Sequence, residues 1–382
     1  MKFFFQPLLI FIPVFLIYFI FSNQKSAIYN HHVYLADAFL KGTVEIKNPP
    51  SWHNDVAHFK GKIYSIYAPM PAILLLPLVV FQGLAANEAL LNLFLGALSV
   101  TLFFLILKKL KFTTSFSLWL VSLYAFGTLH FFSSVHDQTW WYTYIVVELF
   151  LLLIIYEVLG KKRAFLIGLL LGFAYLTRLE AIFILAFVLI MLNWEKVNWQ
   201  KNLGLSLGIL PAFLIHSYYN FIRFGNIFET GYSIFVRSDP SSVIPYGLFS
   251  LKYFPFNFKT YFLTGPEIIS KFPYLKPPWM GMSIFLVTPA LLYIFKTIKR
   301  DPLIIGAWLT VILMAIPPLT YFLPGWTEFG WKHSVMFIPL LMLLMIRGMD
   351  GKLNYLGKIL IILSIIVNFW GVLWWKLAGW FY

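Results

Sequence analysis

Residues 1–22 read MKFFFQPLLIFIPVFLIYFIFS, a largely apolar run of the length that crosses a bilayer. Similar runs recur along the 382-residue chain as far as residue 376. Lipid offers backbone amides no hydrogen-bond partner, so runs of about 20 apolar residues fold as helices. The chain is 60% hydrophobic and 12% charged, whereas a soluble domain carries about 25% charged residues. The sequence therefore predicts an all-α, polytopic membrane protein with a single integral domain over residues 1–382.

The net charge of +14 is not a sign of nucleic-acid binding. Basic residues stand in short clusters at predicted helix ends, at 108–111, 161–163 and 296–300. Such clusters are typical of cytoplasmic loops, so we interpret the charge as a topology signal. The chain has no cysteine, which excludes disulfides and thiolate metal sites. Residues 1–22 are not followed by a small-residue cleavage site, so we expect a retained first helix rather than a signal peptide.

Hydropathy predicts a transmembrane bundle of about 11–13 helices. The expected helices cover residues 3–22, 71–86, 89–107, 115–133, 141–159, 164–177, 180–193, 202–220, 280–296, 303–322, 332–347 and 356–376. Two hydrophilic intervals are long, at 23–70 and 221–279, and we expect short interfacial helices within them.

The basic clusters also predict the topology. If they are cytoplasmic, both long intervals lie on the outer face of the membrane. One conflict arises at 71–86, an apolar segment interrupted by proline. If 71–86 and 89–107 both cross the bilayer, the cluster at 108–111 falls on the outer side. Either 71–86 is re-entrant or this cluster breaks the rule, and the sequence leaves both alternatives open.

Ionisable side chains gather on the predicted outer face. The chain has only 15 carboxylates, and those in the outer loops are Asp37, Glu45, Asp55, Asp137, Glu229, Asp239, Glu267 and Glu328. Histidines in these loops or at an outer helix end are His31, His32, His53, His58, His136, His216 and His333. An outward-facing active or binding site explains this distribution. The alternative is that long external loops are polar simply because they are wet.

The first outer interval contains a helical pattern at 30–42. Helical spacing places Asn30, Tyr34 and Asp37 on one face, and His31 on another. We expect a helix along the membrane surface that aims Asp37 into the bundle. The alternative is an ordinary amphipathic interfacial helix with a solvated Asp37.

The same interval continues with Asp55, a Gly-Lys turn, Tyr64 and Tyr67, before a proline-rich start to the second helix. Prolines are common in a first helical turn, whose free amides can hold an anion. His53, Asp55 and His58 also suggest a divalent-metal site. The alternative is that these histidines only form hydrogen bonds.

Three predicted helix ends present a cation to the outer interface, namely Arg178, Arg223 and Lys332. Lipid headgroup phosphate lies at this depth, so we interpret them as phosphate-binding groups. The alternative is that they anchor the helices, with the charged end reaching toward water. Their polar neighbours are further candidates for substrate binding: Glu180, Glu229, Tyr232, Glu328 and His333.

Five segments resemble, in their order and on their common face, the GT-C superfamily of membrane glycosyltransferases. The closer resemblance is to its bacterial branch near the dolichyl-phosphate-mannose protein mannosyltransferases (family 39-like). The matching segments are NHHVYLADAFLKG (30–42), DVAHFKGKIYSIYAPMPA (55–72), GLLLGFAYLTRLEA (168–181), YNFIRFGNIFETGY (219–232) and GWTEFGWKHSVMFIPLL (325–341).

The resemblance implies a GT-C-like bundle in the bacterial cytoplasmic membrane, with an active site that faces outward. It implies an inverting transferase that moves a sugar from a polyprenyl-phosphate donor to a glycan, lipid or protein acceptor. In such a reaction one carboxylate deprotonates the acceptor, and cations stabilise the lipid phosphate as it leaves. No cofactor is certain, and a divalent metal stays an open alternative.

The chain departs from the family at the catalytic carboxylate. The family often has an Asp-Glu pair four residues before a tyrosine in the first outer loop. Counted back from Tyr34, that position is Asn30-His31 here. We therefore expect Asp55 or Asp37 to act as the base, and rank Asp55 first because its loop also carries the segment that would approach the donor. The motif residues Asn30, His31, Tyr34, Tyr64 and Tyr67 are candidates for substrate binding.

Two other functions stay open at this point. A transporter or flippase of lipid-linked glycans needs polar groups at the middle of the bilayer, and Glu148 is the strongest candidate for one. A catalytically inactive GT-C-like protein is the third alternative, because Asn30-His31 replaces the acidic pair.

Overall fold

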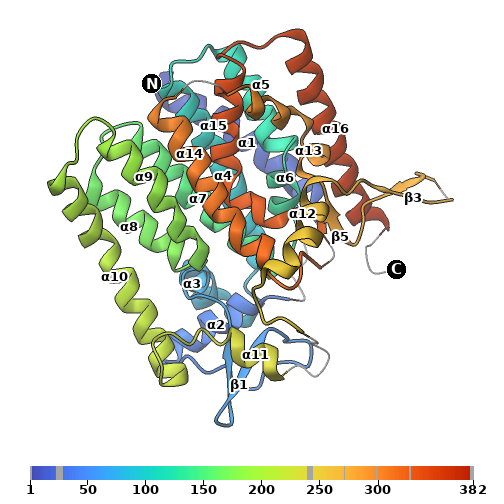
Figure 1. The fold of residues 1–382 in the computed structure, drawn as a ribbon. Coiled ribbons are helices and arrows are strands. Elements are labelled where there is room, and N and C mark those ends of the chain that lie inside the picture. The colour runs from blue at the N-terminus through green and yellow to red at the C-terminus, as the bar shows by residue number, and fades with distance from the viewer. Residues whose placement is uncertain are drawn as a thin grey trace.

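The computed structural model describes residues 2–22, 29–238, 244–270, 272–297, 300–326 and 328–378, and it is mostly helical (Figure 1). The α-helices are α1 (Lys2–Phe21), α2 (His31–Leu40), α3 (Met70–Gln82), α4 (Glu88–Lys109), α5 (Thr114–Phe126), α6 (Leu129–Val135), α7 (Thr139–Val158), α8 (Ala164–Tyr175), α9 (Ile184–Asn193), α10 (Trp199–Phe224), α11 (Tyr232–Ser238), α12 (Phe254–Phe262), α13 (Ile284–Val287), α14 (Pro302–Thr320), α15 (Ile338–Gly348) and α16 (Tyr355–Ala378).

Short 3₁₀ helices and strands complete the fold. The 3₁₀ helices are η1 (Gly83–Ala85), η2 (Leu179–Phe183), η3 (Leu251–Tyr253), η4 (Pro289–Lys296) and η5 (Lys332–Phe337). The strands form three two-stranded sheets: β1 (Val56–Phe59) with β2 (Lys62–Ser65), β3 (Glu267–Ile268) with β4 (Leu275–Lys276), and β5 (Met280–Met282) with β6 (Glu328–Gly330). The first two pairs are antiparallel and the third is parallel.

Within the described residues, five helices are long and apolar enough to cross a membrane: α4, α7, α10, α14 and α16. The pair α5 and α6, bent by 53° between its two parts, makes a sixth if it counts as one span. Shorter apolar helices occur at 6–21, 70–85, 164–175 and 179–193. The structure is therefore compatible with an all-α membrane bundle, with fewer full-length spans than the about 11–13 that hydropathy predicts.

The centre of the bundle is formed by α4 and α7, which pack along each other (Figure 1). Of the apolar window of α7, 89% is buried, against 33% for α10 and for α16. These two helices lie at opposite flanks and expose apolar side chains such as Leu214 and Ile366. An apolar surface of this kind is stable when it faces lipid, so α10 and α16 are the natural lipid-facing walls.

Glycines allow α8 and α10 to approach closely. A Cβ added at Gly168 of α8 would meet the carbonyl oxygen of Leu205, and one at Gly208 of α10 would meet that of Phe165. Small residues at such positions let helix backbones approach closely. In lipid the hydrophobic effect does not drive helices together, so this close van der Waals packing stabilises the helix pair. This contact holds α10 beside α8, and both helices end next to the cavity described below.

The basic clusters lie together at one end of the bundle. Lys109, at the end of α4, donates to the Tyr156 carbonyl near the end of α7 at 3.0 Å. Lys162 donates to the carbonyl of Met191 in α9 at 3.5 Å. The clusters at 108–111 and 161–163 therefore share an end, which we call the basic end.

Both ends of α3 lie at the opposite end of the bundle, beside the first turn of α7. The hydroxyl of Tyr142 donates to the Pro71 carbonyl at 3.1 Å, at the start of α3. Glu88, just after η1, lies against Thr139. Since α3 begins and returns at the same end, it does not cross the bundle, and the cluster at 108–111 joins the others. The structure thus favours the re-entrant alternative for 71–86.

The two long polar intervals meet at this same end, below the bundle in Figure 1. The hairpin of β1 and β2 packs against α11. Arg223, near the end of α10, donates to the Ser65 carbonyl of β2 at 2.6 Å. Residues 29–70 and 221–238 therefore build one polar cap, which we call the polar end. It contains α2, which confirms the helix predicted at 30–42.

Some predicted helices are interrupted, among them those at 115–133, 280–296 and 332–347. Residues 280–296 were expected to form a single helix, but the structure has β5, the short α13 and the 3₁₀ helix η4 there. β5 pairs with β6, Met280 opposite Glu328, which draws the start of this segment into a sheet. Hydropathy alone does not report such pairing, because strand and helix segments can be equally apolar.

The α8–α10 contact predicts a position-specific loss of stability. Gly208→Ala adds a methyl group against the Phe165 carbonyl oxygen and forces the helices apart, so we expect a loss of about 1–3 kcal/mol. Gly204→Ala is the matched control, because the nearest atom to its Cβ is Ala164 Cβ at 3.5 Å. Thermal unfolding of the detergent-solubilised protein measures both. Equal stability of the two variants would contradict the packing described here.

The course of α3 predicts the side from which three positions can be labelled. The chain has no cysteine, so single cysteines can be placed at the exposed residues Lys60, Gln82 and Lys111. We expect Lys60→Cys and Gln82→Cys to react with a membrane-impermeant maleimide from one side, and Lys111→Cys from the other. Labelling of Gln82→Cys together with Lys111→Cys would show that α3 crosses.

Candidate functional site

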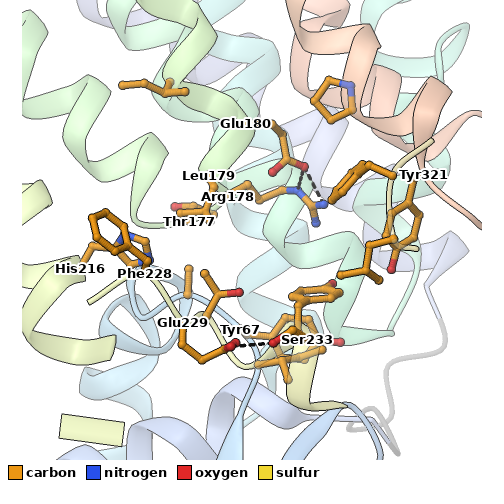
Figure 2. Close-up of a pocket in the computed structure, with 18 of the residues that line it drawn as sticks. Tyr67, Thr177, Arg178, Leu179, Glu180, His216, Phe228, Glu229, Ser233 and Tyr321 are labelled. Atoms are coloured by element: carbon orange, nitrogen blue, oxygen red, sulfur yellow. Dashed lines mark hydrogen bonds and ion pairs between the residues drawn. The ribbon is translucent and has the colours of Figure 1, made fainter. Parts of the chain in front are cut away.

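A cavity of about 570 Å³ opens at the polar end (Figure 2). Its walls come from the end of the β1–β2 hairpin, the segment after α8, the end of α10, the start of α11 and the end of α14. The predicted site residues that line it are Tyr67, Arg178, Glu180, Arg223, Glu229, Tyr232 and His333. Segments far apart in the sequence thus bring seven of the predicted site residues to one place, and the other predicted site residues do not line this cavity.

Arg178 lies where α8 gives way to η2, and it is held by a carboxylate. Its Nη2 atom lies 2.7 Å from Glu180 Oε1, and its Nε donates to the same oxygen at 2.8 Å (Figure 2). The guanidinium stacks on the ring of Tyr144, 4.2 Å from the ring centre. An arginine fixed in this way keeps its orientation, but much of its charge is already neutralised by its partner.

Arg223 differs because no carboxylate pairs with it among the described residues. Its three nitrogens donate to neutral oxygens: Nη1 to the Ser65 carbonyl at 2.6 Å, Nη2 to the Asn220 amide at 2.7 Å, and Nε to the Tyr219 carbonyl at 3.1 Å. The side chain is only 4% exposed. A buried cation without a counterion is costly unless an anion joins it, so Arg223 is a candidate anion-binding group of the cavity.

Asp55 lies behind the cavity wall rather than on it. It precedes β1 with a φ of 53°, a left-handed conformation that Asp tolerates better than most residues. Its Oδ2 accepts a hydrogen bond from the hydroxyl of Tyr67 at 2.6 Å. Tyr67 itself lines the cavity, so the carboxylate is connected to the cavity through this phenol. Burial, followed by the charge of Asp55, raises the pKa of Tyr67.

Glu229 is the second carboxylate of the cavity wall. Its Oε1 accepts from the Gly231 amide at 2.7 Å, and its Oε2 accepts from the Ser233 hydroxyl at 2.6 Å (Figure 2). Both bonds are made within the turn that begins α11, so Glu229 shapes this turn as well as the cavity. Beside it, burial raises the pKa of Tyr232 to about 12, which keeps that phenol protonated at neutral pH.

Two histidines line the cavity. His216 in α10 forms hydrogen bonds with the Tyr175 hydroxyl at 2.6 Å and with the Asn220 amide at 3.1 Å. His333 is different, because its buried Nδ1 has no partner among the described residues. Burial, with the nearby charges of Lys332 and Arg178, holds the pKa of His333 well below its usual value. His333 is therefore neutral and retains hydrogen-bonding capacity for a ligand.

Three further histidines pack behind Tyr67 in the first outer interval. The rings of His31 and His53 lie 4.4 Å apart, and the ring of His32 lies 4.9 Å from that of Tyr67. Burial and the neighbouring His31 lower the pKa of His53 to about 3. No group of three His, Asp or Glu side chains in the described part of the chain is placed to hold a metal ion.

The predicted alternative of a metal site at His53, Asp55 and His58 thus finds no geometric support. His58 stands exposed on β1, whereas His53 is buried against other rings. His53 lies in the loop before β1, whereas His58 lies within β1.

Asp37, the other predicted base, lies away from the cavity wall. Its Oδ2 forms an ion pair with Lys41 at 2.6 Å, one turn along α2, and the Lys41 side chain is 65% exposed. The predicted aim of Asp37 into the bundle does not match this placement, because the inner face of α2 carries the apolar and histidine side chains instead. Asn30, buried at the start of α2, and Tyr34, which makes edge-to-face contacts with Trp52 and His53, also lie outside the cavity.

Lys332 does not line the cavity either. It forms an ion pair with Glu328, whose side chain is fully buried, so the predicted phosphate-binding role does not fit its surroundings. Burial raises the pKa of Glu328, although the lysine opposes this effect. Tyr64, another predicted binding residue, packs against Phe224 in a small apolar cluster. Asp239 lies outside the described residues.

Glu148, the midplane carboxylate, is sealed in the bundle. It accepts a hydrogen bond from the Tyr124 hydroxyl at 2.7 Å and lies 2.6 Å from His130 Nδ1. His130 Nε2 faces the Gly96 carbonyl at 3.1 Å. All of these side chains are buried, and they join α4 and α7 at the bend between α5 and α6. The network explains how the bend is held.

Sequence reasoning identified the arginines but missed several of their partners. Tyr144, which stacks on Arg178, lies in a predicted apolar helix, and its spacing in the sequence does not indicate a role in the site. Tyr321 and Ser233 also line the cavity, although Tyr321 lies in the predicted helix at 303–322 and Ser233 in the polar interval at 221–279, and neither belongs to a motif. His216 was noted only as one of the outer histidines, although its position on the polar face of α10 was a usable signal.

Comparison of the chain with known proteins found no matching family, no similar curated protein and no similar solved structure.

The buried histidines predict a pH-sensitive first outer interval. The pKa of His53 falls from 6.5 to about 3 on folding, so between these values the unfolded segment binds more protons than the folded one. Stability is therefore fully present above about pH 6.5 and declines as the pH falls toward 3. Hydrogen exchange of residues 29–70, corrected for intrinsic rates, should show weaker protection at pH 5 than at pH 7.

Two matched variants test whether His53 causes this pH dependence. His53→Gln removes one titrating group and should reduce the pH dependence, and His58→Gln, on an exposed position of β1, should leave it unchanged. Equal protection of the wild-type interval at the two pH values would contradict the neutral, buried state of His53.

Proposed function

We propose that the protein is a membrane glycosyltransferase that moves a sugar from a polyprenyl-phosphate donor to an acceptor at the outer face of the membrane. The observation that supports this most directly is the composition of the cavity wall. Arg178 and Arg223 share it with Tyr67, whose hydroxyl bonds to Asp55 at 2.6 Å. A reaction that expels a lipid phosphate needs this combination of cations and a basic carboxylate.

The proposed reaction uses the carboxylate as a base and the arginines as phosphate-binding cations. The acceptor oxygen attacks the anomeric carbon and loses its proton to a carboxylate, while the bond from that carbon to the phosphate oxygen breaks with inversion. The leaving phosphate is stable as an anion, so a protein acid is not required. Arg223, a cavity cation without a carboxylate partner among the described residues, is the first candidate to hold this phosphate, and Arg178, which is paired with Glu180, is the second.

The lining of the cavity supports a lipid-linked donor. Where the end of η2 packs against α14, the wall carries the apolar side chains of Ile182, Phe183, Pro317 and Pro318, whereas Glu180 at the start of η2 is polar. The polar side is formed by the hairpin, α10 and α11. A donor with a sugar phosphate on one end and a prenyl chain on the other matches this division, because each part would meet a surface of its own polarity.

The proposed orientation rests on the separation of the two ends. If the basic end is cytoplasmic, the cavity faces the outside of a bacterial cytoplasmic membrane. The acceptor would then be a glycan, lipid or protein of the cell envelope. The architecture proposed for the bundle is GT-C-like, on the sequence resemblance of the segments at 30–42, 55–72 and 168–181.

The proposal predicts a graded response to three carboxylate variants in reconstituted vesicles. The assay measures sugar transfer to a cell-envelope fraction from a panel of labelled polyprenyl-phosphate hexoses and pentoses. Asp55→Asn should lower the rate on the order of 10²–10⁴-fold, the usual value of a general base. Asp37→Asn should lower it much less, because that carboxylate is paired with Lys41. Glu267→Gln, an exposed carboxylate paired with Lys276, is the control.

The arginine that lacks a carboxylate gives a second, independent prediction. Arg223→Gln keeps hydrogen-bonding capacity but removes the charge, and we expect a loss on the order of 10²–10³-fold in transfer. Retention of full rate by both Arg223→Gln and Asp55→Asn would refute the assignment of this cavity. Absence of transfer by the wild type with every donor would favour the catalytically inactive alternative.

A further inference from the structure

We propose that Tyr67 is a catalytic residue that passes the acceptor proton to Asp55, so that the base of the reaction is a phenol–carboxylate pair rather than a lone carboxylate. This inference rests on the proposed function and refines it. It follows from the placement of the two side chains, since Tyr67 lines the cavity whereas Asp55 does not, and the Tyr67 hydroxyl donates to Asp55 Oδ2 at 2.6 Å.

The position of Tyr67 is fixed by contacts on several sides. Its ring lies 5.5 Å from that of His31 and 4.9 Å from that of His32, both in α2. Its backbone amide donates to the Ser65 hydroxyl at 3.2 Å, and its carbonyl accepts from the Tyr219 hydroxyl at 3.4 Å. A side chain held in this way stands between Asp55 and the cavity, and an acceptor in the cavity would meet the phenol first.

The hydrogen bond has only one direction. An ionised carboxylate only accepts, so the phenolic proton points to Asp55 and the lone pairs of the Tyr67 oxygen remain for another donor. An acceptor hydroxyl in the cavity can donate to this oxygen. Burial raises the pKa of the phenol, which disfavours a free tyrosinate, so the two protons would move together rather than in sequence.

The step balances without a further reactant. The acceptor proton moves to the Tyr67 oxygen, the phenolic proton moves to Asp55 Oδ2, and the acceptor oxygen forms its bond to the anomeric carbon. The bond from that carbon to the phosphate oxygen breaks, and its electron pair stays on the phosphate. The negative charge thus moves from Asp55 to the phosphate near Arg223, and Tyr67 ends the step as a neutral phenol.

The alternative is that Tyr67 only orients Asp55. In that case an acceptor would have to displace the phenol and reach the carboxylate directly. The two alternatives predict different effects on the transfer rate when the Tyr67 hydroxyl is removed. If Tyr67 relays the proton, its hydroxyl is as necessary as the carboxylate, whereas an orienting hydroxyl contributes only part of the rate.

The test compares Tyr67→Phe, Asp55→Asn and the double variant, in vesicles, with the donor and envelope acceptor that the wild type uses. We expect each single variant to lose kcat by a similar factor on the order of 10²–10⁴, and the double variant to lose no more, because the groups act as one unit. The KM for the donor should stay within about twofold, since the donor phosphate contacts other residues. Tyr274→Phe, on an exposed loop position, is the control.

A second test uses only the wild-type protein, so it does not depend on whether a variant folds. Single-turnover transfer is followed in mixtures of H₂O and D₂O. Two protons in flight give a curved dependence of the rate on the deuterium fraction, and a single proton gives a straight line. A straight line, or a Tyr67→Phe enzyme with more than a tenth of the wild-type kcat, would overturn the relay while leaving the glycosyltransferase in place. A wild type without transfer overturns both proposals.

Discussion

The cost of placing charge in hydrocarbon orders the whole bundle. A charged side chain at the bilayer centre costs several kcal/mol, roughly 3 or more, and this chain keeps nearly all of its ionisable groups at the two ends. In the described part of the chain, Glu148 and His130 are buried inside the bundle and are paired with each other. The apolar core offers polar side chains no hydrogen-bond partners. The polar side chains at each end of the bundle must therefore pair with one another, and at the polar end they do so around a cavity.

The charges of the cavity wall are close to balanced before any ligand binds. Arg178 is matched by Glu180, whereas Arg223 and Glu229 both line the cavity and, in the described part of the chain, form no ion pair with each other. A phosphate that enters would contact the unpaired arginine while the carboxylates stay occupied by hydrogen bonds. Protonation of the base during transfer would remove one negative charge as the phosphate gains one, so the total charge of the site stays constant through the reaction.

Much of the fold was predictable from hydropathy, because long apolar runs have one solution in lipid. The interfacial helix α2 and the convergence of Arg178 with Arg223 also followed from spacing and from the basic clusters. The course of α3 did not, since it depends on a hydrogen bond between Tyr142 and the Pro71 carbonyl. The choice between Asp55 and Asp37 likewise depends on which side chain finds a partner in space, Tyr67 or Lys41, and spacing alone does not decide between them.

The most direct test is to find where a lipid phosphate binds. A polyprenyl phosphate that carries a photoreactive diazirine near its headgroup is incubated with the reconstituted protein, irradiated, and mapped by mass spectrometry. We expect labelled peptides from 177–183, 228–233 and 317–321, with labelling suppressed by unlabelled polyprenyl phosphate. Labelling confined to the lipid-facing surface of α16, without such competition, would contradict a substrate site in this cavity.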